Sequence, residues 1–194
     1  MSKSIALGKS PESPEERRQL IAEHLMAEDY LAHLQASHIQ KGVIDFLISN
    51  RGYSPGEIEI NREFEVQLPG CSFTVRADII VKVVGTCFLA IKCVMNSLES
   101  WERHSVAFCR VAGPCVIPYA AVTDGETVLL IETDRCTTVS GNLELLPPRK
   151  EAVRTLGTRP CPFPGERAER EKRILYAFDA IRCDAGPPLN DSVT

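Results

Sequence analysis

Two short segments decide how this chain folds, Arg76-Ala77-Asp78-Ile79-Ile80 and Ile91-Lys92-Cys93-Val94. They lie inside two runs, Phe73–Val84 and Cys87–Met95, that are rich in β-branched residues, as strands buried on at least one face are. Gly85 lies between the runs and indicates a tight turn. The sequence therefore predicts two adjacent antiparallel strands, with an acid, Asp78, on the first and a lone lysine, Lys92, on the second.

The expected turn sets the pairing of the two strands. A three-residue loop at Val84-Gly85-Thr86 places Val83 opposite Cys87 and therefore Asp78 opposite Lys92. Because residues i and i+2 of a strand share a face, Val94 points the same way as Lys92. We expect the carboxylate of Asp78 and the ammonium of Lys92 to meet on one face of the sheet.

Patterns on either side of these strands predict an α/β domain. Helical spacing of apolar residues begins at Glu15, continues as a second amphipathic stretch and ends at Gly52. The other predicted elements are a strand over 57–68, a helix over 98–111, a hairpin of 117–123 and 127–133 around Asp124-Gly125, and a helix over 167–181. The expected fold is a mixed β-sheet flanked by helices, with a helical N-terminal extension and a C-terminal helix.

Composition is that of a globular protein outside the membrane. The 194 residues are 44% hydrophobic and 25% charged, with a formal net charge of −4. No run of eighteen apolar residues occurs and Met1–Pro14 holds no apolar signal region, so we expect a cytoplasmic protein with no membrane partner. The acidic net charge lowers the expectation of strong DNA binding, although it does not exclude a local basic patch.

The eight cysteines are expected to be reduced thiols. None belongs to a Cys-x-x-Cys pair, and the four histidines do not combine with them at zinc-finger spacing. Several lie within apolar strand or helix patterns, where a free cysteine behaves as a small core residue.

The region from Arg51 to Pro148 resembles the N-terminal nuclease domain of type I restriction enzyme R subunits, which belongs to the PD-(D/E)XK nuclease superfamily. The segments that carry the resemblance are 76–80, 89–93, 100–103 and 117–125. The resemblance implies a restriction-endonuclease-like fold. Together with the composition and periodicity of the flanking segments, it predicts a flexible tail (1–14), N-terminal helices (15–52), a nuclease-like core (53–148), and a connector with a C-terminal helix (149–194).

The resemblance also implies a metal-dependent active site, and here that site is altered. In such nucleases, acids on the two strands bind Mg²⁺ and a lysine positions the attacking water. Of these residues only Asp78 is present, because Lys92 stands at the position of the second acid and Val94 at that of the lysine. Three helical positions also differ from the family: Gln40 stands in place of an acid, and His104 and Phe108 in place of Gln and Tyr.

The exchange of an acid for Lys92 favours an inactive site. An ammonium instead of a carboxylate about 4 Å from a divalent ion reverses a term of roughly 8 kcal/mol at an effective dielectric constant near 20. We therefore expect Lys92 to occupy the place of the metal ion and to pair with Asp78, with no cofactor required. The alternative is an active Mg²⁺-dependent endonuclease that uses Asp78, as its metal ligand, and Lys92, with another acid such as Glu63 or Glu65.

Four cations are candidates for nucleic-acid contact: Arg76, Lys82, Arg103 and Arg110. A solvated face explains them equally well, and the cations of the C-terminal helix are interleaved with acids, which favours pairing within the helix. His104 and Trp101 are interpreted as packing residues in preference to a general base and a base-stacking platform. The sequence leaves open whether the partner is DNA, another protein or a second copy of the chain.

Overall fold

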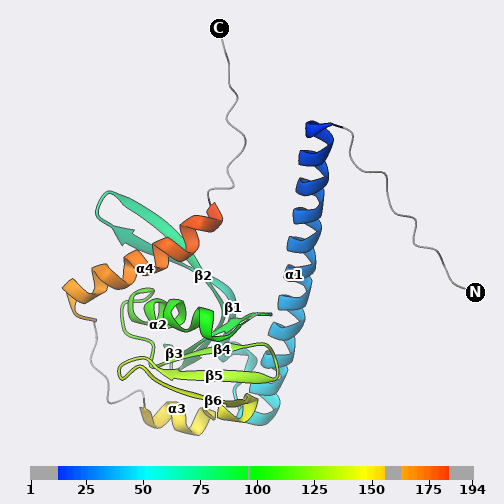
Figure 1. Ribbon diagram of the computed structural model, residues 1–194. Coiled ribbons are helices and arrows are strands. Elements are labelled where there is room, and N and C mark those ends of the chain that lie inside the picture. The colour runs from blue at the N-terminus through cyan, green and yellow to red at the C-terminus, as the bar shows by residue number, and fades with distance from the viewer. Residues whose placement is uncertain (1–12, 96, 156–162, 184–194) are drawn as a thin grey trace, which may run out of the picture.

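The computed structural model describes residues 13–95, 97–155 and 163–183 (Figure 1). Almost all of the predicted tail and the proline-rich part of the predicted connector lie outside these residues. Within them the chain forms a mixed α/β fold, as the sequence predicts.

The described strands form one six-stranded sheet in the order of the sequence. All neighbouring strands are antiparallel except the central pair β3–β4, which is parallel. The strands are β1 (Ile58–Leu68), β2 (Cys71–Val83), β3 (Thr86–Cys93), β4 (Tyr119–Thr123), β5 (Thr127–Glu132) and β6 (Thr137–Asn142). The parallel pair requires a crossover, which α2 (Glu102–Val111) supplies, preceded by a 3-10 turn at Glu99–Trp101.

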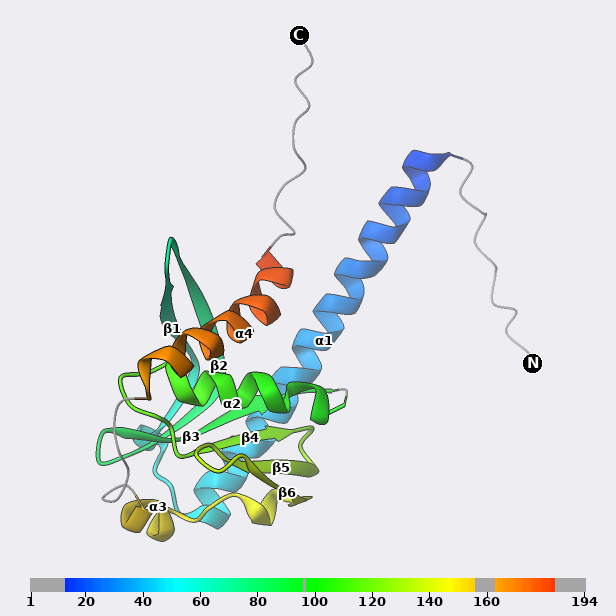
Figure 2. The same cartoon turned by 60° about the vertical axis from the view of Figure 1, so that its left-hand side comes forward.

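Helices cover both faces of the sheet (Figures 1 and 2). On one face, α2 and α4 (Gly165–Cys183) contribute residues such as Val106, Phe108 and Leu175 to a core with β1–β5. On the other face, α1 (Pro14–Arg51) and α3 (Arg149–Thr155) contribute Val43, Leu47 and Ala152 to a second core. The sheet therefore lies between two apolar layers, which explains the near-continuous apolar runs of β2 and β3.

The two N-terminal amphipathic stretches form one uninterrupted helix, α1. Its C-terminal half packs on the sheet, whereas its N-terminal half projects beyond the body of the molecule (Figure 2). The helix ends before Gly52, whose φ of 77° is the left-handed conformation that glycine accommodates without strain.

Two elements of the C-terminal half were not predicted from the sequence. The edge strand β6 follows β5 through a turn and pairs with it along its length. The helix α3 occupies the first part of the predicted connector. Each buries few apolar side chains. The sequence of neither element therefore shows the periodic spacing of apolar residues from which helices and strands are predicted.

The prediction that every cysteine is reduced is wrong for Cys115, which is disulfide-bonded. Five described cysteines are free: Cys71, Cys87, Cys93, Cys109 and Cys136. Cys93 and Cys109 are buried, as expected of core residues. Among the described residues, no helix is both long and apolar enough to cross a bilayer.

A closed acid–lysine site on β2 and β3

The turn between β2 and β3 is shorter than predicted, yet Asp78 and Lys92 still meet. Val83 pairs with Thr86, so the turn has two residues, Val84 and Gly85, with φ values of 50° and 77°. This is the backbone of a type I′ hairpin turn. The difference from the predicted three-residue loop is one residue of register.

A β-bulge restores the predicted pairing. Lys82 pairs with Cys87, but the next pair is Val81 with Leu89, so Phe88 is an extra residue on β3. From there the register continues through Ile79–Ile91, and its extension places Asp78 opposite Lys92. The predicted outcome is therefore correct although the predicted loop is not.

Both carboxylate oxygens of Asp78 are engaged. Lys92 Nζ lies 3.1 Å from Oδ1, and the backbone N–H of Cys93 donates to Oδ2 over 2.8 Å. The two side chains are 12% and 17% exposed, so the ion pair is largely removed from water. A charge-assisted hydrogen bond of this kind is much stronger than one on an open surface, where water competes for both groups.

The remaining contacts hold the pair in place. Lys92 Nζ lies 5.2 Å from the ring centroid of Trp101, which ends the 3-10 turn before α2, within the range of a cation–π interaction. Burial, and then the negative charge of Asp78, raise the pKa of the Cys93 thiol to about 12 against the opposing effect of Lys92. This thiol therefore stays protonated near neutral pH and is not a nucleophile.

Gln40 of α1 reaches the same place from the other side of the strand. Its Nε2 donates to the backbone carbonyl of Asp78 over 2.6 Å and to Asn61 Oδ1 over 3.2 Å. Asn61 has a φ of 52°, and it interrupts the β1–β2 pairing at the position facing Asp78. The amide of Gln40 thus satisfies a carbonyl that the ladder leaves free, at the position where the resemblance implies an acid.

The other positions of the implied nuclease motif are used for packing. Val94 is buried in the core between the sheet and α2. Phe108 packs edge-to-face on Phe64 with ring centroids 5.2 Å apart. His104 is 4% exposed and its Nε2 lies 3.4 Å from Asp179 Oδ2 on α4.

The acids of the alternative active site do not converge on Asp78. In the register of the β1–β2 hairpin, Glu63 lies opposite Arg76 and Glu65 lies opposite Thr74, further along the hairpin from Asp78. Both glutamates are exposed. In the part of the chain that the structure describes, no three His, Cys, Asp or Glu side chains are placed to share a metal ion.

The four predicted nucleic-acid contacts do not form one basic surface. Lys82 pairs with Glu59, and both Arg103 and Arg110 pair with Glu171 at 2.6 and 2.8 Å. Arg76 is exposed on β2 opposite Glu63.

A second charged site is lined by two of the four predicted cations, Arg103 and Arg110, together with cations of α4 that were not predicted as contacts. A cavity of about 770 Å³ lies beside α2 and the first turns of α4. Arg167 and Arg170 line it, although the interleaved acids of α4 indicated a balanced helix. The one signal available was the three-residue spacing of Arg167, Arg170 and Arg173, which places them near one another on the helix.

No protein-family model, curated protein or solved structure matches this chain.

Proposed function

We propose that this protein has a nuclease-type scaffold in which a lysine replaces the metal ion, and that it binds nucleic acid or a protein partner without hydrolysing it. The resemblance to type I restriction enzyme R subunits motivates the nuclease ancestry. The order of elements is compatible with it, since an antiparallel hairpin bearing Asp78 and Lys92 leads through α2 into the parallel strand β4.

One observation supports the proposal that the protein does not hydrolyse its ligand. Both carboxylate oxygens of Asp78 already accept hydrogen bonds, one from Lys92 Nζ and one from the Cys93 amide. A Mg²⁺ ion needs octahedral oxygen coordination at about 2.1 Å and usually takes one or two carboxylates. For Asp78 to become such a ligand, Lys92 must leave a largely buried pair, and its ammonium would then lie beside a divalent cation. Both changes are unfavourable, so we expect Asp78 to keep its lysine.

A plasmid-nicking assay with Mg²⁺ and with Mn²⁺ separates this function from an endonuclease that uses Asp78 and Lys92. We expect no nicking above that of the Asp78→Ala variant prepared in the same way. Robust nicking by the wild-type protein that Asp78→Ala abolishes would establish the endonuclease instead.

A gain-of-function variant tests the scaffold itself. Lys92→Glu places a second carboxylate beside Asp78, as the implied nuclease site requires. We expect this variant to bind Mn²⁺ in calorimetry and to become more resistant to urea when Mn²⁺ is added. The matched Lys92→Gln variant, which removes the ammonium without adding an acid, should do neither.

If Lys92→Glu folds and gains no Mn²⁺ site, the two strands are not arranged as a former metal centre. That result would remove the nuclease ancestry from the proposed function.

A further inference from the structure

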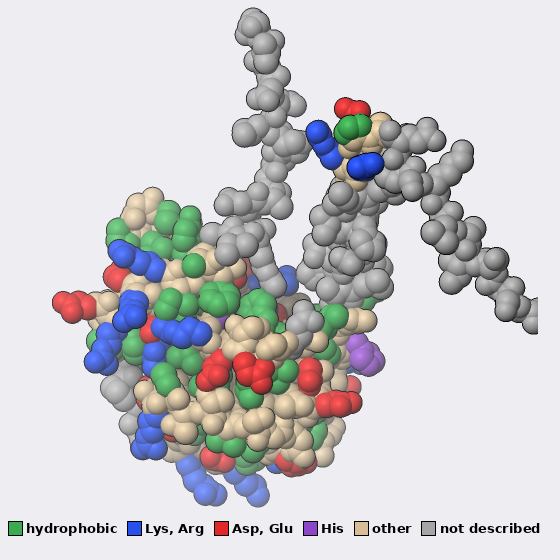
Figure 3. All heavy atoms as spheres, in the orientation of Figure 1, with side chains coloured by type: hydrophobic (Ala, Val, Ile, Leu, Met, Phe, Trp, Pro, Cys, Tyr) green, Lys and Arg blue, Asp and Glu red, His purple; other side chains and the backbone are tan. Residues whose placement is uncertain are grey.

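The cavity beside α4 is lined by both charged and apolar side chains. It lies between α2, the β5–β6 turn and the start of α4. Its charged and apolar lining residues include Arg167, Arg170, Glu99, Glu102, Asp134, Val106, Val116 and Phe163. A volume of about 770 Å³ is within the range of small-molecule sites. Figure 3 shows Lys and Arg side chains gathered on the side of the molecule where α4 begins.

Two acids of α4, Glu169 and Glu171, pair with cations other than Arg167 and Arg170. Glu171 is 5% exposed, and its carboxylate is held by Arg103 and Arg110 of α2. Glu169 pairs with Lys172 at 2.8 Å. Neither of these acids therefore forms an ion pair with Arg167 or Arg170.

Arg167 and Arg170 consequently present their guanidinium groups to the cavity and to solvent. Both are exposed, and neither forms an ion pair with another of the described residues. They stand three residues apart, so both can reach one anionic group. Guanidinium groups form bidentate hydrogen bonds that match the geometry of a phosphate.

The apolar side chains that line the cavity are suited to a flat ring. Phe163, Val106 and Val116 contribute its apolar surface. The guanidinium carbon of Arg110 lies 5.2 Å from the centroid of the Phe163 ring, and Glu171 fixes this arginine in turn. A planar ligand can stack on such an aromatic platform, as nucleobases do in single-strand-binding proteins.

Acidic side chains also line the cavity. Glu102 accepts a hydrogen bond from the Thr138 hydroxyl, and Glu99 accepts one from Ser97 over 2.8 Å. Each carboxylate can accept further hydrogen bonds, because two oxygens offer about four acceptor sites. Carboxylates accept hydrogen bonds from the exocyclic amino group of cytosine in protein–nucleic acid complexes.

We propose that this cavity binds a nucleotide unit, with its phosphate on Arg167 and Arg170, its base on Phe163, and the amino group of the base directed to the acidic residues. An anionic group joined to a flat ring that carries N–H donors is the ligand that this combination of residues fits. The inference rests on the binding role proposed above, but it uses neither Asp78 nor Lys92. The source is either a free nucleotide or a nucleotide within a single strand.

Calorimetric titration of the full-length protein tests this ligand class. The probes are the four ribonucleoside monophosphates, inorganic phosphate, the nucleoside cytidine and a short single-stranded oligonucleotide. We expect CMP, GMP and AMP to bind at least about tenfold more tightly than phosphate or cytidine alone, the ratio that one charge-assisted hydrogen bond supplies. UMP, which lacks an exocyclic amino group, should bind less tightly than CMP.

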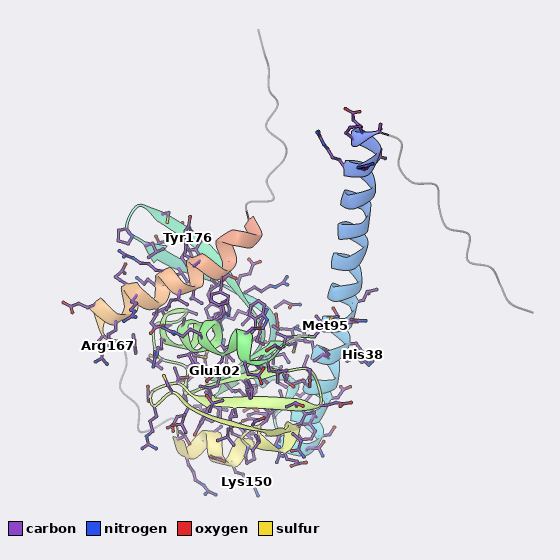
Figure 4. All side chains as sticks on the ribbon, viewed as in Figure 1. His38, Met95, Glu102, Lys150, Arg167 and Tyr176 are labelled. Atoms are coloured by element: carbon purple, nitrogen blue, oxygen red, sulfur yellow. The ribbon has the colours of Figure 1, made fainter. Side chains whose placement is uncertain are left out.

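Matched variants locate the site. Arg167→Gln with Arg170→Gln should weaken CMP binding at least about tenfold and reduce its salt dependence. The control, Lys150→Gln with Arg154→Gln, removes two cations from α3, away from the cavity, and should leave the affinity unchanged; Figure 4 shows Lys150 and Arg167 in these separate places. Tighter binding of the oligonucleotide than of CMP assigns the site to a strand, and the reverse assigns it to a free nucleotide.

Equal affinities for phosphate and CMP, failure of every nucleotide probe to bind, or equal effects of the two double variants would each overturn the nucleotide site. None of these results bears on the Mn²⁺ titration of Lys92→Glu, so a failure here is distinguishable from a failure of the proposed scaffold.

Discussion

The Asp78–Lys92 pair and the cavity beside α4 contain similar charges in opposite arrangements. On the strands, the acid and the lysine face each other, and little of either is left for an outside ligand. On α4, Glu169 and Glu171 pair with other cations, and Arg167 and Arg170 remain exposed. The difference teaches that binding capacity follows from which charges are already satisfied. The net charge of −4 does not show which of the charged side chains are already paired and which are free to bind a ligand.

The largest expected effect comes from opening the closed site. Lys92→Met leaves the carboxylate of Asp78 largely buried without its cation, which should lower the free energy of unfolding by about 3 kcal/mol. Urea denaturation at neutral pH measures this change.

Asp78→Asn in the same chain is the control for that measurement. Asparagine can still accept from the Cys93 amide but carries no charge, so the double variant should recover most of the loss. Equal stability of Lys92→Met and the wild-type protein would mean that the pair is not a closed site.

A smaller effect is expected where a buried acid holds two arginines. Burial alone would raise the pKa of Glu171, but hydrogen bonds from Arg103 and Arg110, together with their charges, outweigh it and hold this pKa below its usual value. Glu171→Gln should therefore destabilise the protein by about 2 kcal/mol at neutral pH, the contribution of a hydrogen bond to a charged group.

The pH dependence of that difference has a definite sign. A carboxyl group with a lowered pKa in the folded state stabilises the protein above its unfolded pKa, about 4.3, and loses this contribution as the pH falls through the folded pKa. Urea curves of wild type and Glu171→Gln should thus differ at pH 7, and the difference should shrink below about pH 4.3 and vanish once the pH is below the lowered folded-state pKa of Glu171. A difference that persists at low pH would show that the charge of Glu171 is not its source.

The smallest effect is expected in the β2–β3 turn, which sets the register of Asp78 together with the bulge at Phe88. Val84 is 83% exposed and holds a φ of 50°, a conformation that a β-branched residue adopts only under strain. Val84→Asn should raise the free energy of unfolding by about 0.5 kcal/mol, and Gly85→Ala should lower it by about 1 kcal/mol. Thermal unfolding of the two variants checks both signs, and a gain from Gly85→Ala would contradict the type I′ turn.

The sequence predicts most of the layered fold because its strands alternate or are continuously apolar. It also predicts the meeting of Asp78 and Lys92, although through a loop that is too long by one residue. The compensating bulge at Phe88 has no local signature, because Phe88 and Leu89 are both apolar.

The unpredicted parts depend on contacts distant in the sequence. β6 contains one hydrophobic residue, Val139, which is half exposed, so no alternation of buried and exposed residues indicates a strand. The cavity depends on Glu171 reaching Arg103 and Arg110 on another helix, whereas the sequence of α4 favours pairing within it. The way α4 docks on α2 decides which cations Glu171 meets, and the spacing of residues within α4 does not show this.

The most direct test of the central claim is a crystal of the wild-type protein soaked in Mn²⁺ and measured at the manganese absorption edge. Replacement of the metal by Lys92 predicts no anomalous peak at Asp78, with Lys92 Nζ still within hydrogen-bonding distance of Oδ1. A manganese ion coordinated by Asp78, with Lys92 displaced, would contradict it.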